Sequence, residues 1–244
     1  MNIDGQCEWR PLAFSSDRLR AFVTLGNGPL LLKGQAIVVN ANANVMNVEG
    51  WKREPLPSMS SIQLQDVVVD ASPNLLLLSP SADLRPRDII KDPNWTQFCG
   101  GDQRINLWSS PRDTIGEVLL NTAALSHAAD ENPSSTAHYE RFSVVANLWF
   151  APAGTDCLIH REHSFIEIHS QIVGVGHMQK FHSQNHASLY AAVALAPGAT
   201  TERPFCVVNN EGAFIYPWHQ YFAESDCIWL AIEYHPLKNG NEHA

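Results

Sequence analysis

The first half of this chain contains no histidine. All eleven histidines of the 244 residues follow position 126, and six of them lie between His160 and His186. Residues 1–126 therefore offer carboxylates, hydroxyls and thiols but no imidazole. A metal site or an acid–base pair built on imidazole must come from the second half, because imidazole is the common ligand and proton carrier near neutral pH.

Basic residues and long apolar runs are also scarce. The 16 Lys and Arg are outnumbered by 25 Asp and Glu, which gives a formal net charge of -9. A protein that binds phosphate backbones usually carries a basic surface, so we expect no nucleic-acid partner. The apolar run around Leu75–Leu78 is far shorter than the roughly 18 residues of a membrane span. The segment Met1–Arg10 is polar, and we expect neither an export signal nor a membrane partner.

Cysteine is present in an odd number and without close pairs. The five cysteines are widely spaced, and no CxxC motif occurs. This pattern favours a reducing cytoplasm, with each cysteine serving as a small buried apolar residue. Hydrophobic residues make up 45% of the chain and charged residues 17%, which excludes a disordered, collagen-like or coiled-coil protein.

Short segments with strand character recur along the whole chain. They are rich in Val, Ile, Leu and aromatic residues and are bounded by Gly, Pro, Asn, Asp or Ser. The predicted strands are Leu19–Leu25, Leu30–Val39, Ile62–Val69, Asn74–Leu78, Phe142–Phe150, Phe165–Val173, Leu189–Leu195, Cys206–Val208, Ala213–Tyr216 and Cys227–Tyr234. We expect short helices or turns at Ser81–Phe98 and Thr114–His127, and a loop between two halves at Ala128–Thr136.

The segment Gly154–Gly176 contains the densest group of chemically active side chains. On a straight strand His163, Glu167 and His169 share one face, because side chains two residues apart point the same way. A bulge or turn near Arg161–Ser164 would bring His160 to the same face. Imidazoles that converge with one carboxylate suit Fe(II), Mn, Ni or Zn, and they leave positions open for substrate or dioxygen.

This spacing resembles the first motif of the cupin superfamily, G-x5-H-x-H-x3,4-E-x6-G. Gly154, His160, Glu167 and Gly174 fall in register with it. The chain departs from the motif in the middle, where His160 and His163 are separated by two residues and Glu162 occupies the strict second position. Either His163 reaches the site through a local bulge, or only one of the two histidines binds. We favour both as ligands, because bulges are common beside active sites.

The second cupin motif, G-x5-P-x-G-x2-H-x3-N, is matched only in part. Gly212, Pro217 and His219 are present at a shorter spacing, but the inner glycine and the final asparagine are absent. Between the two motifs, Pro197 and Gly198 form a pair that suits a type II turn, since Gly198 can adopt a positive φ. The resemblance covers about Phe142–His235.

The resemblance implies an all-β fold with a cupin-type double-stranded β-helix barrel at residues 138–244. Residues 1–137 are then a β-rich N-terminal half, which is a candidate for a degenerate second cupin without metal, and the short helices decorate the sheets. The implied ligands are His160, His163, Glu167 and His219, binding one divalent ion. Fe(II) is preferred, with Mn, Ni and Zn left open.

The resemblance leaves several functions open. Our first choice is a metal-dependent enzyme that oxidises a small organic molecule with dioxygen, in the manner of a dioxygenase. The alternatives are a non-redox isomerase, cyclase or lyase, in which His169 or Glu162 moves a proton, and a ligand-sensing or binding protein without catalysis. We also leave open a structural role for His169. The expected partner is a small-molecule substrate, and a homodimer is left open.

Overall fold

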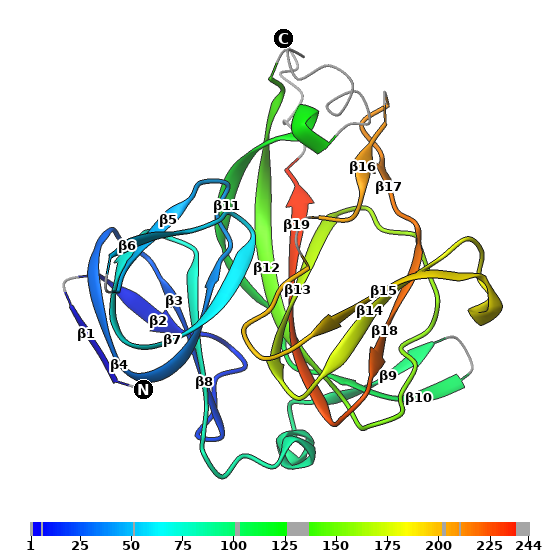
Figure 1. Ribbon diagram of the computed structural model, residues 1–244, viewed down its shortest axis with the longest axis horizontal. Coiled ribbons are helices and arrows are strands. Elements are labelled where there is room, and N and C mark those ends of the chain that lie inside the picture. The colour runs from blue at the N-terminus through cyan, green and yellow to red at the C-terminus, as the bar shows by residue number, and fades with distance from the viewer. Residues whose placement is uncertain are drawn as a thin grey trace.

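The computed structural model describes residues 2–5, 7–50, 52–100, 103–125, 137–201, 204–209 and 211–237. His127, His243 and the loop predicted at residues 128–136 lie outside this part of the chain. The described residues form antiparallel strands and a few short 3-10 helices, which confirms the predicted all-β class (Figure 1). None of the described helices has the length and apolar character needed to cross a membrane.

The first eight strands form one sheet in the order β2-β3-β8-β4-β7-β5-β6, with β1 paired to β4. Their bounds are β1 Asn2–Gly5, β2 Trp9–Pro11, β3 Leu19–Thr24, β4 Gly28–Asn40, β5 Met46–Glu49, β6 Arg53–Leu56, β7 Ser60–Ala71 and β8 Leu75–Pro80. Figure 1 shows them as a rolled unit in blue and cyan. These strands lie within the segment 1–137 for which the sequence predicts a β-rich N-terminal half.

The remaining strands form a second unit beside the first (Figure 1). A six-stranded sheet has the order β13-β19-β12-β10-β9, with β11 also paired to β12; a three-stranded sheet has the order β15-β14-β18, and β16 pairs with β17. The strands are β9 Thr96–Gly100, β10 Gln103–Ser109, β11 Asp113–Asn121, β12 Tyr139–Ala151, β13 Ile166–Val173, β14 Gly176–Phe181, β15 Leu189–Leu195, β16 Val207–Val208, β17 Phe214–Ile215, β18 Trp218–Ala223 and β19 Cys227–Pro236. Strands β9 to β11 precede the predicted boundary at residue 137, yet they belong to this sheet.

One hydrophobic core joins the two units. In β8, Leu76 and Leu78 point into this shared core, whereas Leu75 and Leu77 point into the interior of the N-terminal unit. In β19, alternate residues such as Leu230 pack into the same shared core. The opposite faces of β13 and β19 are therefore free to line a cavity inside the second unit, as strand alternation requires.

The predicted strands each overlap an observed strand, but the segment Thr114–His127, predicted as a short helix or turn, is mostly a strand. Residues 113–121 form strand β11, followed by the short 3-10 helix η2 at Thr122–Leu125. The register of β11 shifts between Thr114 and Gly116, and this irregularity places Ile115 and Val118 in one core although they are three residues apart. Such spacing imitates the period of a helix. Within the other predicted helical segment, the 3-10 helix η1 spans Pro86–Lys91, and a third one, η3, spans His186–Ser188.

Candidate metal centre

The structure brings together the four residues that the motif indicated as ligands. One nitrogen or carboxylate oxygen from each of His160, His163, Glu167 and His219 lies within 4.8 Å of all the others. The Nε2 atom of His219 is 3.3 Å from Nε2 of His163 and 3.3 Å from Oε1 of Glu167. The Nε2 atom of His163 is 3.6 Å from the same Oε1 atom.

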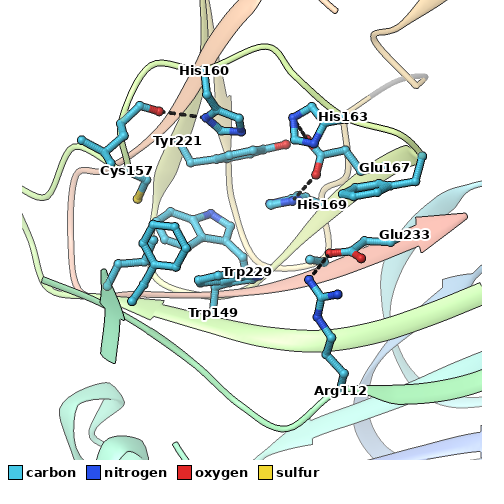
Figure 2. Close-up of a pocket in the computed structure, with 15 residues that line it drawn as sticks. Arg112, Trp149, Cys157, His160, His163, Glu167, His169, Tyr221, Trp229 and Glu233 are labelled. Carbon is cyan, nitrogen blue, oxygen red and sulfur yellow. Dashed lines mark hydrogen bonds and ion pairs between the residues drawn. The ribbon is translucent and has the colours of Figure 1, made fainter. Parts of the chain in front are cut away.

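Two strands and one loop position this cluster. Glu167 is the second residue of β13, and His219 lies on β18. His160 is tied to His219 by an isolated antiparallel bridge, in which the backbone N–H of each donates to the carbonyl of the other at 2.9 and 2.8 Å. The chain then leaves strand geometry until Ile166, and this turn directs His163 toward Glu167, as Figure 2 shows.

Glu162 is not part of this cluster. Its side chain is exposed, and Glu162 lies neither among the clustered ligands nor among the residues that line the adjacent cavity. A regular strand from His160 would have placed Glu162 beside it, but the segment after His160 is a loop and strand parity does not apply there. The sequence left open whether Glu162 or His163 lies at the site. In the structure His163 belongs to the cluster and Glu162 lies outside it.

In two of the imidazoles, the ring nitrogen Nδ1 lies within hydrogen-bond distance of a backbone carbonyl. Nδ1 of His160 lies 3.0 Å from the carbonyl oxygen of Leu158, and Nδ1 of His219 lies 2.9 Å from that of Pro217. An Nδ1–H that donates to a carbonyl leaves the Nε2 lone pair free for a metal. Leu158 has a φ of 67°, a conformation that costs a bulky residue energy and that is often found beside functional sites.

The protonation states of His160, His163 and Glu167 suit a divalent cation. Burial lowers the pKa of His163 to about 4, and burial together with the nearby His219 lowers the pKa of His160. Burial alone would raise the pKa of Glu167, but hydrogen bonds with His169 and His219 outweigh it and hold this pKa well below its ordinary value. Neutral imidazoles beside an ionised carboxylate are the forms that bind metal.

His169 contacts the carboxylate oxygen that faces away from the other ligands. Its Nε2 atom lies 3.4 Å from Oε2 of Glu167, while Oε1 faces His163 and His219. The ring of His169 is stacked on Tyr221, with ring centres 4.1 Å apart and an angle of 7° between the planes. His169 therefore orients Glu167, and its own orientation is fixed by Tyr221.

Tyr221 was not identified from the sequence, although it shares a strand face with His219 two residues earlier. Figure 2 shows its ring between His160 and His169, with the hydroxyl directed toward His163 and Glu167. The hydroxyl is buried and has no hydrogen-bond partner among the described residues. A buried hydroxyl left unpaired costs about 1–3 kcal/mol. This orphaned group fits a site whose contents include a metal and a ligand bound to it.

A cavity of about 400 Å³ opens beside the cluster. Its walls are mainly aromatic and aliphatic and include Phe98, Leu107, Trp149 and Trp229. Arg112 and Glu233 line another part of the same cavity (Figure 2). Neither was predicted from the sequence, but a single carboxylate inside the apolar segment of β19 is a signal that strand parity could have used.

The comparisons with known proteins return solved structures only. No protein-family model and no curated protein matches the chain. Ectoine synthase from P. lautus is 21% identical over 39% of this chain and 55% of that chain, with a TM-score of 0.26. An RmlC-like cupin protein from Desulfovibrio desulfuricans is 18% identical over 38% of this chain and 71% of that chain, with a TM-score of 0.26.

A Cupin 2 conserved barrel domain protein from Leptotrichia buccalis matches over a longer span, with 9% identity, 94% of this chain, 89% of that chain and a TM-score of 0.29. Proteins named as cupins are thus among the structures that this chain is similar to. The chain spans about half of the ectoine synthase it matches.

Proposed function

We propose that this protein is a metal-dependent enzyme that acts on a small organic molecule, and that its reaction is an oxygen-dependent oxidation of the dioxygenase type. The observation that carries this proposal is the position of the donor cluster beside a largely apolar cavity of about 400 Å³. A concave apolar pocket with a few convergent polar groups is the usual form of a small-molecule site.

The donor set supports a metal with open coordination positions. His160, His163, Glu167 and His219 would hold one divalent ion, Fe(II) by preference, and four protein ligands leave two positions of an octahedral ion free. Such an ion, when bound, acts as a Lewis acid and as a template that orients substrate and dioxygen. The protein's own contribution is to fix these ligands, to keep Glu167 ionised and to exclude water with aromatic walls.

The placement of the candidate proton carriers keeps a non-redox reaction as the second candidate. Such a reaction needs a side chain free to take a proton from the substrate. Glu162 is exposed outside the cavity and Nε2 of His169 is engaged with Glu167, but Nδ1 of His169 is buried and has no hydrogen-bond partner among the described residues. An imidazole that donates from Nε2 carries its basic lone pair on Nδ1, so His169 is the residue that an isomerisation, cyclisation or elimination would use.

The test is reconstitution of the metal-free protein under anaerobic conditions with Fe(II), Mn, Ni or Zn in turn. We expect about one metal per chain, because the described residues hold one such cluster. With Fe(II) bound, oxygen uptake is then measured against panels of organic acids, amino acids and aromatic compounds. Uptake dependent on one of these compounds supports the proposal.

The matched variant is Glu167→Ala, which we expect to lose metal while keeping its fold, since the core of β12, β13 and β19 is apolar. Circular dichroism checks the fold, and elemental analysis checks the metal. Two stoichiometric metals per chain, no metal with any of the four ions, or tight zinc with no oxygen uptake by the Fe(II) form would contradict the proposed function.

A further inference from the structure

Glu233 is a buried carboxylate on the wall of the cavity, close to the metal cluster. It lies on β19 in register with Glu167 on the neighbouring strand β13, so both side chains point to the same face. Only 4% of Glu233 is exposed. A buried carboxylate is costly unless it is paired and hydrogen-bonded. Its presence in an apolar strand therefore indicates that it is paired and that it has a role in the cavity.

Both oxygens of Glu233 have partners. Oε1 accepts a hydrogen bond from Nη2 of Arg112 at 2.9 Å, and Oε2 lies 2.8 Å from Nε2 of His235. Glu233 is thus engaged on both sides and does not offer a free base to the cavity. What it does is hold the guanidinium of Arg112, which reaches it from the loop between β10 and β11 (Figure 2).

Arg112 keeps hydrogen-bonding capacity for a ligand. Its side chain is 56% exposed although it lines the cavity, and its hydrogen bond to a described residue uses Nη2. A guanidinium has five N–H donors in a planar fork that matches a carboxylate. Because Glu233 fixes this fork at the cavity edge, less side-chain entropy is lost when a ligand binds.

The charges around the cavity would favour an anion once a divalent ion is bound at the cluster. A divalent ion and Arg112 together outweigh Glu167 and Glu233 by one positive charge, if the cluster imidazoles are neutral. This local balance is opposite in sign to the formal net charge of -9 on the whole chain. A ligand with one negative charge would neutralise it, and such complementarity sets specificity.

The other walls of the cavity indicate which non-polar groups the ligand carries. Trp149, Trp229, Phe98 and Leu107 form apolar walls, and aromatic rings of this kind pack on flat or branched hydrocarbon groups. Glu167 and Glu233 are paired across the neighbouring strands β13 and β19, and the Cβ atoms of such a pair are about 5 Å apart. The metal cluster and the residue that holds Arg112 are therefore adjacent on one face. A molecule that spans them is short.

We propose that Arg112, held by Glu233, binds the carboxylate of a small monocarboxylic acid whose aromatic or branched body lies against the tryptophans. This inference rests on the proposed function, because it names the substrate class of the same site. Arg112 is here a specificity-determining residue, and Glu233 and His235 position it.

The experiment measures binding of benzoate and isovalerate, each beside its neutral amide, to the full-length protein with and without zinc. Isothermal calorimetry and the fluorescence of the cavity tryptophans give the affinities. We expect each acid to bind about tenfold more tightly than its amide, and we expect Arg112→Gln to remove this preference. Arg112→Lys, which keeps the charge but not the fork, is expected to retain only part of it.

Arg141→Gln is the matched control, because Arg141 is an exposed arginine of β12 that pairs with Glu117 and does not line the cavity. This variant should keep the full preference. Equal affinity for acid and amide, no binding of either acid, or a preference that survives Arg112→Gln would overturn the inference. A preference that needs zinc but not Arg112 would place the carboxylate at the metal instead. Metal content is measured separately, so failure to take up metal is recognised as failure of the proposed function.

Discussion

At the scale of single residues, His163 and Glu162 are adjacent in the chain but lie in different surroundings. His163 contributes Nε2 to the cluster, whereas Glu162 is exposed. We expect His163→Ala to lower metal affinity by at least about tenfold, the scale found when even a residue that supports a metal ligand is lost. Glu162→Ala removes no ligand and should leave the affinity unchanged.

Competition with a chelator of known affinity, applied to both variants and the parent protein, measures this difference. The opposite outcome, in which Glu162→Ala weakens binding and His163→Ala does not, would mean that the loop after His160 folds as a regular strand. The site would then consist of two histidines and two carboxylates.

The sequence predicted the clustered histidines and Glu167 better than the rest of the site. The motif resemblance was sufficient to group His160, His163 and Glu167, because they are close together in the chain, although the sequence left the choice between His163 and Glu162 open. Tyr221, Arg112 and Glu233 come from three separate segments, and their meeting depends on how β18, β19 and the β10–β11 loop pack. A single signal existed in the carboxylate of Glu233 inside the apolar segment of β19, but the sequence does not show that these three residues meet in one cavity.

At the scale of elements, strand alternation was informative wherever a strand was regular. It failed at β11, where the register shift brought Ile115 and Val118 to one face and imitated a helix. Strand alternation also did not identify β14 and β18, because their polar residues obscure the alternation of apolar and polar side chains. The turn at Gly198 was predicted correctly, and the residue adopts a φ of +87°.

This turn also connects the two units, and Gly198 has little free space. Its N–H donates to the carbonyl of Gln171 on β13, and its own carbonyl accepts a hydrogen bond from Ser61 on β7, both at 2.9 Å. A Cβ atom at this position would lie 2.8 Å from the backbone nitrogen of Gln63. An added methyl group must therefore displace backbone, not merely a flexible side chain.

We expect Gly198→Ala to lower the free energy of unfolding by more than the roughly 1–2 kcal/mol that a left-handed backbone costs an L-residue. Gly154→Ala is the matched control, since Gly154 has a φ of +80° and no atom within 4 Å of the added Cβ. Urea unfolding of both variants measures the difference. Equal losses of unfolding free energy in the two variants would show that the contact of Gly198 with β7 adds nothing to the cost of the substitution.

At the scale of the whole molecule, the two units are joined by more than the linker between them. Tyr234 of β19 donates from its hydroxyl to the carbonyl of Ala41 at 3.2 Å, and Arg10 of β2 makes a bidentate ion pair with Asp113 of β11 at 2.9 Å. The shared core contains residues from β3, β4 and β8 and from β12, β13 and β19. The back of the sheet that carries Glu167 is thus covered by the N-terminal unit.

This shared core predicts one cooperative unfolding transition for the whole chain, because neither unit can separate without exposing it. Leu78→Ala removes contacts between the units, and Leu77→Ala removes contacts inside the N-terminal unit; both residues are fully buried. Each substitution should cost about 2–5 kcal/mol. Each should also shift the same transition, seen alike by circular dichroism and by release of bound zinc. If the units instead unfold independently, Leu77→Ala will lower the midpoint of an early transition seen by circular dichroism. The midpoint of zinc release will then be the same as in the parent protein.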